Sequence, residues 1–410
     1  MHERVLDLLR CPFCGTRLSL VENDALLRVG DRIESGVLGC ECCAFPVVAG
    51  IPVMIANDAT RDAMHALERG ERETALLTLL GVDDTRRERF RAFLARGKHA
   101  TYREGLDILS HDAEGTCFLY RFSDPTFVLA ESLVRAIGAD RRRTSHVIDL
   151  CGGSGHLTRV LSELSGSRVV VADVFYWKLW LAQRFTAPGC APVCCDANHP
   201  LPFKQESFSL VVLSDAFPYI WHKRLLAGEM MRLASEKGTI LMPHLHSSLG
   251  FNFSAGMTLT PAAYCDLFTP ARPWLFRDSD LLNDILGHTA IDLSRGVTPE
   301  QAGDEPSVTL VASRDGQVFR KHALADPDTL TGELRVNPLY RVEQNGAQAA
   351  LTLTFPTPEY EEEFGGGCRR YLPETVTVDA DLTGRFVPAT LGTAYEELRR
   401  RRIVIDAPAR

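Results

Sequence analysis

The sequence predicts an α/β protein: a largely parallel sheet covered by helices, preceded by a small cysteine-rich unit and followed by an α+β extension. Three observations lead to this expectation. From residue 146 onward, short strands rich in β-branched residues alternate with amphipathic helices, as in a parallel sheet. Within that region, one strand runs into a glycine-rich turn and a helix over 147–161. The first 43 residues contain cysteines in two C-x-x-C pairs.

The composition is that of a globular protein large enough for two or three domains. The chain has 410 residues, of which 45% are hydrophobic and 24% are charged, and its formal net charge is −8. This acidic balance argues against a broadly basic nucleic-acid surface. No apolar run reaches the roughly 18 residues that span a bilayer, and no signal-peptide pattern is recognisable. We therefore expect a cytoplasmic protein without a membrane partner.

Four segments of the chain differ in pattern. Residues 1–56 contain the paired cysteines and end in the apolar string AFPVVAGIPVMI. Residues 57–110 have Leu and Ala at helical spacing among many Arg and Glu, which predicts a helical connector. Residues 111–314 carry the strand–helix alternation, and residues 315–410 change to short strands followed by one helix. We expect four domains with these boundaries.

The alternating segment predicts five successive strands with helices between most of them. The strands are expected at 146–150, 167–173, 191–197, 208–215 and 238–246. After a long insertion, a last helix and two edge strands are expected within 279–295 and 307–314.

The stretch VIDLCGGSGHLTRVL places three glycines within four residues, at Gly152, Gly153 and Gly155. Glycines let a ligand approach the backbone closely, and a turn after a parallel strand lies at the carboxyl edge of the sheet. Taken alone, this turn also fits a plain tight connection between a strand and a helix. The strands that follow favour a ligand site.

Three successive strands end in an aspartate. Asp173 ends the second strand, Asp196 follows the third and Asp215 follows the fourth. Side chains at the carboxyl ends of parallel strands meet at one edge, where a carboxylate can accept hydrogen bonds from ribose hydroxyls. Each aspartate alone also fits a helix N-cap. Three in succession predict a nucleotide-type site.

The run from residue 146 to about residue 248 resembles the class I S-adenosylmethionine-dependent methyltransferases. Their glycine motif reads D-x-G-x-G-x-G, which this chain matches at Asp149, Gly153 and Gly155. The resemblance implies a Rossmann-like sheet and S-adenosylmethionine as cofactor, with the two glycines beside its methionine portion, Asp173 at the ribose and Asp196 at the adenine. The cofactor-binding residues that it implies are Asp149, Cys151, Gly153, Gly155, Asp173, Val174, Asp196, Ala197, Ser214 and Asp215.

Cys151 departs from the family's glycine motif. Three interpretations are open: lost cofactor binding, a redox-sensitive thiol, or a tolerated replacement. The third requires a negative φ at this residue, because side chains are strained at positive φ. We expect a tolerated replacement with an unreactive thiol.

The paired cysteines predict a tetrahedral zinc site that stabilises the N-terminal unit. Cys11 and Cys14 form one C-x-x-C pair, and Cys40 and Cys43 form the other after a hairpin-length insert. The string CECC also offers Cys42 in place of Cys43. The unit resembles the small zinc-ribbon proteins that activate tRNA, rRNA and protein methyltransferases, which implies a scaffolding role.

Three histidines are candidates for the acceptor side. His244 and His246 end the fifth strand, where period-two alternation points both to the same side, and either is a candidate general base. His222, just past the fourth strand, is the third candidate. The alternatives for the pair are a structural role and a His-x-His metal site, for which the sequence shows no compelling further ligand.

The leading hypothesis is an enzyme that methylates a small molecule in specialised metabolism. The acidic balance and the long additions on the acceptor side favour a metabolite over RNA. Two alternatives are open: a methyltransferase acting on tRNA or protein, and a non-catalytic partner subunit with a methyltransferase fold. The last hundred residues are expected to cover the substrate site or to mediate dimerisation into a homodimer.

Overall fold

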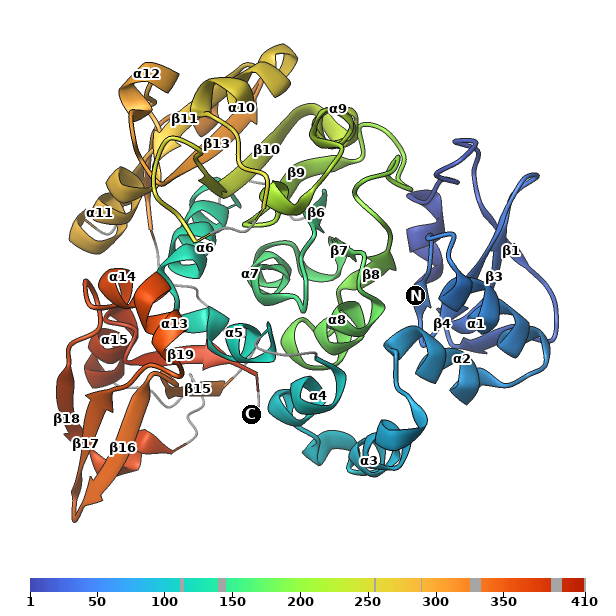
Figure 1. Ribbon diagram of the computed structural model, residues 1–410, viewed down its shortest axis with the longest axis horizontal. Coiled ribbons are helices and arrows are strands. Elements are labelled where there is room, and N and C mark those ends of the chain that lie inside the picture. Colours follow the sequence, from blue (N-terminus) through green and yellow to red (C-terminus); the bar gives the residue numbers. More distant parts are fainter. Residues whose placement is uncertain are drawn as a thin grey trace.

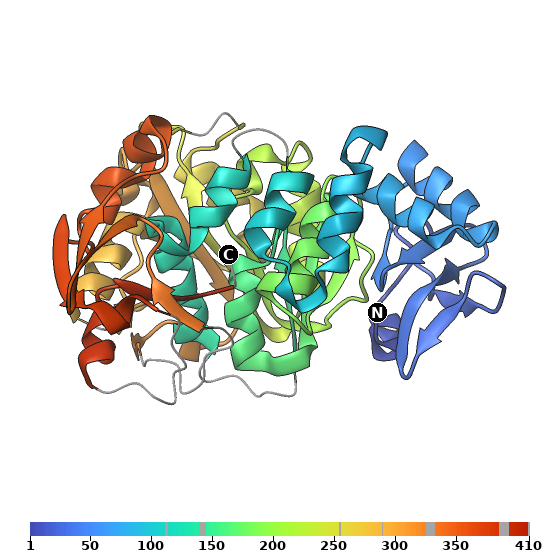
Figure 2. The same cartoon turned by 90° about the horizontal axis from the view of Figure 1, so that it is seen from below.

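The structure is a computed structural model of the chain (Figure 1). It describes residues 1–110, 114–138, 145–253, 256–288, 290–324, 333–384 and 393–408. The N-terminal strands and the C-terminal extension lie at opposite ends, with the central sheet and its helices between them (Figure 2). Among the helices in these described ranges, none is both long and apolar enough to cross a membrane.

The N-terminal unit is a small antiparallel sheet. Its strands are β1 (Ser19–Val21), β2 (Leu27–Val29), β3 (Arg32–Gly39), β4 (Ala44–Val48) and β5 (Ile51–Pro52), in the order β1-β3-β4-β5 with β2 paired to β3. Backbone hydrogen bonds attach the unit to the rest of the chain: Arg10 N–H to the Pro202 carbonyl at 2.9 Å, and Met54 N–H to the Cys194 carbonyl at 2.7 Å. Its buried Leu38 belongs to the same apolar core as the central sheet. The unit is therefore packed onto the sheet and shares its core.

Six helices follow the N-terminal unit. They are α1 (Asp58–Glu68), α2 (Arg72–Leu80), α3 (Asp84–Ala95), α4 (Tyr102–Leu109), α5 (Glu114–Tyr120) and α6 (Pro125–Gly138). The helices expected within 57–110 are present, and the side chains of Asn57, Asp83 and Thr101 cap three of them by accepting backbone N–H groups. Asp124 does the same before α6, where its Oδ1 accepts the Phe127 N–H at 2.7 Å.

The central sheet has seven strands. They are β6 (His146–Leu150), β7 (Val169–Asp173), β8 (Ala191–Cys194), β9 (Phe208–Leu213), β10 (Ala234–His246), β11 (Pro273–Arg277) and β13 (Ser307–Ser313), in the order β11-β13-β10-β9-β6-β7-β8. Strands β6 to β10 are parallel, and β13 is antiparallel to both of its neighbours. This confirms the expected Rossmann-like α/β fold. The direction of winding reverses between β6 and β9, and the crevice outside such a switch point is where open α/β sheets bind ligands.

Helices cover both faces of this sheet because successive strand residues point to opposite sides. One face packs against α6, α7 (His156–Ser165) and α11 (Asp278–His288), and the other packs against α9 (Lys223–Leu233) and α10 (Pro261–Leu267). On β6, Val147 belongs to the first of these cores and Ile148 to the second. At the β8 edge, α8 (Tyr176–Leu181) packs with α2 and α4. Both faces are therefore closed, which leaves the carboxyl edge for a ligand.

The prediction of which strands form the edge of the sheet is wrong in one respect. Strand β13 is present as expected, but the outermost strand is β11, which comes from the insertion before the last helix. The segment expected to supply an edge strand forms β12 (Ala290–Asp292), which pairs with β14 (Lys321–Ala323) in a separate two-stranded sheet. The physical reason is length and burial: β11 pairs with β13 over five residues and buries Leu275 and Phe276, whereas β12 buries only Ile291. Between these strands lies the short helix α12 (Pro299–Ala302).

The C-terminal part is an α+β extension, as expected. Its strands are β15 (Glu333–Val336), β16 (Tyr340–Asn345), β17 (Gln348–Leu353), β18 (Thr375–Asp379) and β19 (Val404–Ala407), and its helices are α13 (Pro358–Tyr360), α14 (Gly366–Cys368) and α15 (Thr393–Arg400). The sheets are β16-β17-β18 and β15-β19. The extension contacts the turn between α5 and α6, where the Tyr371 hydroxyl donates to the Ser123 carbonyl at 2.6 Å. It therefore reaches the segment that leads into the acceptor side of the sheet.

Candidate active site

The glycine turn after β6 needs a glycine at all three positions. A Cβ on Gly152 would lie 2.7 Å from Asp149 Cγ, which is closer than real Cβ atoms come. Gly153 and Gly155 have φ values of +54° and +84°, in the left-handed region that favours glycine. Asp149 is buried beneath the turn, accepts the Thr158 hydroxyl at 2.6 Å, and has its pKa raised to about 7 by burial. Asp149 thus supports the turn from below.

Cys151 does not have the backbone conformation that a tolerated replacement was expected to have. Its φ is +54°, so the residue occupies the left-handed region with a side chain in place of the family's glycine. Burial, together with the charge of nearby Asp173, raises the pKa of the thiol well above its usual range. The thiol is therefore held protonated and unreactive, while the backbone carries the strain.

Asp173 at the end of β7 holds the glycine turn. Its Oδ2 accepts the Gly153 N–H at 2.9 Å, and its Oδ1 accepts the Phe175 N–H at 2.9 Å. The carboxylate is buried, and this burial raises its pKa although both backbone N–H groups act against the rise. A carboxylate oxygen has two lone-pair sites, so each oxygen retains one for a ligand hydroxyl. Val174, the next residue, is 42% exposed.

Helix α5 lies against the glycine turn and is held there by His156, the first residue of α7. The His156 Nε2–H donates to the Phe118 carbonyl at 2.7 Å, and the two rings stack with centroids 5.7 Å apart. Phe118 in turn lies 3.6 Å from the position that a Cβ on Gly153 would take. An ion pair between Lys178 and Glu114 fixes the start of the same helix. No sequence pattern singled out Phe118 or His156, because their contact joins segments 38 residues apart.

The residues expected at the adenine and beside it lie past β8 and β9. Asp196 is only partly free for a ligand: its Oδ1 accepts the Asn198 N–H at 2.8 Å, and its Oδ2 lies 3.1 Å from His199 Nδ1. Ala197 is buried beside it. His222 belongs to this side too, because its Nδ1 contacts the Asn198 carbonyl at 2.8 Å. Its hydrogen bonds do not involve the other two candidate histidines, and it is exposed.

Asp215, His244 and His246 come together at the carboxyl ends of β9 and β10. The His246 Nε2–H donates to Asp215 Oδ1 at 3.0 Å, and the two imidazole rings have centroids 4.8 Å apart. One donor atom from each of the three residues lies within 4.8 Å of the others. Ser214, also expected near the cofactor, directly precedes Asp215. Of the predicted site residues, these three form the most compact group.

A β-bulge brings the two histidines together. The pairing of β10 with β13 shifts register between Met242 and Leu245, and His244 has a φ of +58°. Bulges often re-aim side chains beside active sites, and proline is tolerated at them; here Pro243 lies within the shifted segment. Asp215 is also left-handed, with a φ of +55°. Two of the three clustered residues thus have strained backbones.

Charged groups from distant segments fix the cluster. Arg121 Nη2 donates to Asp215 Oδ2 at 2.8 Å, and although burial acts to raise the pKa of Asp215, Arg121 holds it well below its usual range. The His244 Nδ1–H donates to Asp278 Oδ2 at 2.9 Å, while Asp278 Oδ1 accepts the Thr309 hydroxyl at 2.7 Å. Burial acts to lower the pKa of His244, but the Asp278 hydrogen bond and the charge of Asp215 raise it. The sequence analysis missed Arg121 and Asp278, since neither lies in a recognisable motif.

Tyr264 and an exposed apolar loop border the cluster. Tyr264 is fully buried, and its hydroxyl donates to the His246 carbonyl at 2.7 Å, so it positions the end of β10 and does not face a substrate. The loop after β10 is held beside residues 217–219 by the Met257 N–H, which donates to the Pro218 carbonyl at 2.8 Å. This region exposes apolar side chains, namely Tyr219, Trp221, Leu249, Phe251, Phe253 and Met257.

Four thiols gather at the tip of the N-terminal sheet. The Sγ–Sγ distances are 3.8 Å for Cys11–Cys42, 3.7 Å for Cys14–Cys40 and 3.5 Å for Cys40–Cys42. Zinc–sulfur bonds of about 2.3 Å in a tetrahedron separate the sulfurs by about 3.8 Å. The Cys43 carbonyl accepts the Cys40 N–H at 2.9 Å, which closes the turn between β3 and β4 and leaves Cys42 at its tip. The sulfurs of Cys11, Cys14, Cys40 and Cys42 all lie within 4.8 Å of one another, and Cys43 Sγ lies 3.4 Å from Cys42 Sγ, so both cysteines that the sequence left open are near the group.

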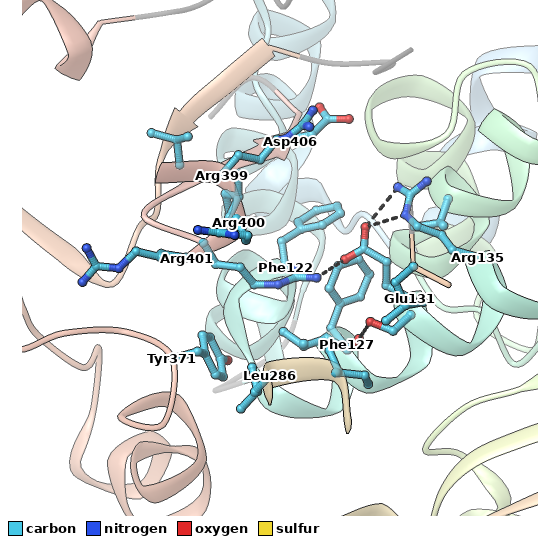
Figure 3. A pocket seen from close by; sticks show the side chains of 18 of the residues that line it. Phe122, Phe127, Glu131, Arg135, Leu286, Tyr371, Arg399, Arg400, Arg401 and Asp406 are labelled. Atoms are coloured by element: carbon cyan, nitrogen blue, oxygen red, sulfur yellow. Dashed lines mark hydrogen bonds and ion pairs between the residues drawn. The ribbon is translucent and has the colours of Figure 1, made fainter. Parts of the chain in front are cut away.

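A separate cavity of about 590 Å³ lies between α6, α7 and the C-terminal extension (Figure 3). Its charged lining residues are largely paired with one another. Glu131 contacts Arg135 at 3.0 Å and Arg402 at 2.6 Å, and Arg159 contacts Asp406 at 2.9 Å. These pairs join the extension to the helices of the sheet, so the cavity is a junction between parts of the fold.

Comparisons with known proteins agree with this architecture. Residues 147–238 match the family model described as a methyltransferase domain. The chain is 39% identical over 72 residues to a UPF0434 protein of Bordetella avium (strain 197N), a match that covers 16% of this chain and 98% of that protein.

Several solved structures are similar to parts of this chain. A S-adenosylmethionine-dependent methyltransferase of Thermotoga maritima, a possible histamine N-methyltransferase, is 13% identical and covers 50% of this chain and 95% of its own, with a TM-score of 0.34. Geranyl diphosphate C-methyltransferase of Streptomyces coelicolor A3(2) is 16% identical, with coverages of 45% and 76% and a TM-score of 0.34. A complex of the Haloferax volcanii Trm112 methyltransferase activator and a putative methyltransferase gives 16% identity, coverages of 49% and 92%, and a TM-score of 0.34.

The strand order and the matched domain together define an S-adenosylmethionine-dependent methyltransferase fold. Over the stretch shared with the Bordetella protein, the chain belongs to the UPF0434 family.

Proposed function

We propose that this protein is an S-adenosylmethionine-dependent methyltransferase that acts on a small-molecule acceptor. The observation that carries the proposal is the hydrogen bond from Gly153 N–H to Asp173, which builds a glycine cradle and a buried carboxylate into one edge of the sheet. At the same edge, Asp215 contacts His246 at the carboxyl ends of β9 and β10. A cofactor cradle and a polar cluster at one switch point are what methyl transfer requires.

The residues of the cradle fit the cofactor. Gly153 and Gly155 adopt the left-handed backbone that this tight turn requires, and the remaining lone pairs of Asp173 suit ribose hydroxyls. Asp196 would border the adenine through the part of its carboxylate not engaged by local hydrogen bonds. When bound, S-adenosylmethionine supplies a methyl group on a positively charged sulfur, which is already a strong electrophile.

The cluster of Asp215, His244 and His246 would face the acceptor and promote loss of its proton. The part of these residues would be to hold the acceptor atom in line with the methyl group that the bound cofactor would supply, and to assist the departure of the acceptor's proton. Of the two histidines, His244 is the better oriented, because Asp278 holds its Nδ1 and leaves its Nε2 toward the cluster. His246 contacts Asp215 through Nε2, and its Nδ1 is buried.

A small acceptor suits the surroundings of this cluster. Glu363 of the C-terminal extension lies near the cluster. Burial is the main cause that raises its pKa, and the charges of Asp215 and His244 also act on it. The extension therefore approaches the acceptor side from one direction, and the apolar loop after β10 approaches it from another. Enclosure of this kind favours a metabolite, and we assign the protein to specialised metabolism on this basis.

The N-terminal unit would carry one structural zinc ion on Cys11, Cys14, Cys40 and Cys42. Their sulfur spacing fits a tetrahedral thiolate site, and thiolate sites of this kind suit the reducing cytoplasm, where we place the protein. The unit shares a core with the central sheet, which supports a scaffolding role within the same chain.

The test uses S-adenosylmethionine with a radiolabelled methyl group and three fractions of a cell extract: small molecules, RNA and protein. The proposal predicts label in the small-molecule fraction, and none with Asp173→Ala. Label in RNA or in protein would replace the small acceptor with a macromolecular one. No transfer, together with no binding of S-adenosylmethionine, would identify a non-catalytic partner subunit.

A further inference from the structure

A carboxylate and two imidazoles meet at the carboxyl edge of the sheet, at the ends of β9 and β10. We propose that Asp215, His244 and His246 hold a divalent cation. The sequence alone offered only a His-x-His pair without a third ligand, and the fold supplies that ligand from the end of β9, 31 residues from His246. The cluster then has two nitrogen donors and one oxygen donor on a single site.

The distances fit a common cation. The Nε2 atom of His246 lies 3.0 Å from Asp215 Oδ1, and all three donor atoms lie within 4.8 Å of one another. Two ligands at about 2.1 Å from a metal ion and at right angles to each other are about 3.0 Å apart. The spacing of His246 and Asp215 fits such a pair of ligands, and a donor atom of His244 lies within 4.8 Å of both.

The outer contacts of His244 are those of a metal ligand. Its Nδ1–H donates to Asp278, which fixes the ring and leaves Nε2 as the available donor. Asp278 is itself held by the Thr309 hydroxyl. Ligating histidines almost always donate their second nitrogen to a carboxylate or carbonyl in this way.

The backbone at the cluster is strained in a way that a ligand site explains. Asp215 and His244 both have positive φ values, and the bulge in β10 directs His244 toward His246. Residues with side chains persist in such strained conformations mainly at functional sites. Both strained residues contribute a donor to the same point.

The charge around the cluster favours a cation. The acidic groups that face it are Asp215, Asp278, Asp124 and Glu363. Against these, Arg121 is the basic side chain that pairs with Asp215 and Asp124. Four carboxylates thus surround one guanidinium, and a divalent ion would offset most of the excess negative charge.

The donor set selects the class of metal. Two imidazoles and one carboxylate suit Mn²⁺, Fe²⁺, Co²⁺ or Zn²⁺, whereas the four thiolates of the N-terminal unit select zinc. If the proposed methyltransferase function holds, the acceptor atom bound to the cation releases its proton to solvent water more readily. His244 and His246 then act as ligands, and no oxidant or reductant takes part.

The test is a titration of the zinc-replete full-length protein with Mn²⁺, followed by the electron paramagnetic resonance signal of free Mn²⁺. Mn²⁺ does not compete for thiolate sites, so binding reports on the cluster. We expect one ion per chain, with the dissociation constant raised at least tenfold in Asp215→Asn and in His246→Gln. Asp278→Asn should raise it about 10–100-fold by loosening His244. The control is His65→Gln, an exposed histidine on α1, which should bind as the wild type does.

Two results would overturn the cation site: no saturable binding of Mn²⁺ by the folded wild-type protein, or equal affinity in the wild type, Asp215→Asn and His246→Gln. Thermal unfolding of each variant shows that it is folded, and His246→Gln keeps the test valid if loss of the Arg121 partner unfolds Asp215→Asn. Binding of S-adenosylmethionine is measured separately. Mn²⁺ binding without cofactor binding would support the cation and reject the methyltransferase function, and the reverse result would reject the cation alone.

Discussion

Asp173 Oδ2 accepts a hydrogen bond from the backbone N–H of Gly153 at 2.9 Å, so the end of β7 holds the turn that follows β6. One carboxylate thus has two tasks: it shapes the cradle and keeps lone pairs for a ligand. A glycine is required at residue 153 because its φ is +54°. The proposed cofactor site therefore depends on two adjacent strands.

Replacing Cys151 with glycine should give a more stable protein than replacing it with alanine. Both variants remove the Sγ atom, so comparing them isolates the backbone at a φ of +54°. A left-handed conformation costs a residue with a Cβ roughly 1–2 kcal/mol, and glycine avoids that cost. We expect Cys151→Gly to exceed Cys151→Ala in free energy of unfolding by about 1 kcal/mol, as measured by urea denaturation. Equal stabilities, or a more stable alanine variant, would show that the turn is unstrained.

Acid should weaken the fold through His156. Burial lowers the pKa of this histidine to about 3, from about 6.5 in the unfolded chain, although the Phe118 carbonyl acts to raise it. The unfolded state therefore binds the proton first, and stability falls as the pH drops from 6.5 toward 3. The loss is about 1.4 kcal/mol per pH unit, or about 2 kcal/mol between pH 6.5 and pH 5.

The comparison variant is His156→Gln, whose amide can still donate to the Phe118 carbonyl but does not titrate. Urea denaturation at pH 7.5 and pH 5 should show the wild type losing about 2 kcal/mol more than this variant. Other titrating groups are common to both proteins and cancel. Parallel losses in the two proteins would mean that His156 is protonated while folded.

Zinc content should distinguish Cys42 from Cys43. Metal analysis of the purified wild type should give about one zinc ion per chain. Cys14→Ser and Cys42→Ser should lose most of it, because each removes a sulfur of the four-thiol group. Cys43→Ser should keep it, because this residue closes the turn through its backbone. Loss of zinc from Cys43→Ser but not from Cys42→Ser would reverse the assignment.

Glu131 should be the main attachment of the C-terminal extension to α6 (Figure 3). Burial acts to raise its pKa, but Arg402 and Arg135 lower it to about 2. Glu131→Gln should cost about 1.5–3 kcal/mol at pH 7, because it removes the carboxylate partner of Arg402 and leaves Arg135 paired with Glu163 alone. The difference should shrink as the pH falls from about 4.5 toward 2, where the wild-type carboxylate is protonated as well.

The control for this prediction is Glu397→Gln, whose partner Arg400 is 64% exposed. An exposed pair contributes less than about 1 kcal/mol, so this change should have little effect on unfolding. Similar losses in the two variants would mean that the Glu131 pairs are no more important than a surface pair.

The order of strands and helices could be predicted from the sequence because each element has its own local pattern of residues. Strands β6 to β9 are short and mostly apolar, and the glycine turn is a local motif. Strand β11 was missed because its five residues lie inside a long insertion, where no neighbouring pattern shows that they pair with β13.

The sequence predicted only part of the candidate site, because the other contacts join residues that are far apart in the chain. His244 and His246 stand in one motif, but Arg121 meets Asp215 across 94 residues and Asp278 meets His244 across 34. Such contacts depend on which strands become neighbours. The positive φ of Cys151 was also inaccessible, since a side chain in a glycine position does not reveal the backbone conformation.

Calorimetric titration of the zinc-replete protein with S-adenosylmethionine tests most directly whether the glycine turn and Asp173 bind this cofactor. We predict one binding site per chain, with affinity reduced at least tenfold in Asp173→Ala and unchanged in His65→Gln. Folded wild-type protein that binds no S-adenosylmethionine, or Asp173→Ala that binds it as well as the wild type, would show that the turn and Asp173 do not form the cofactor site.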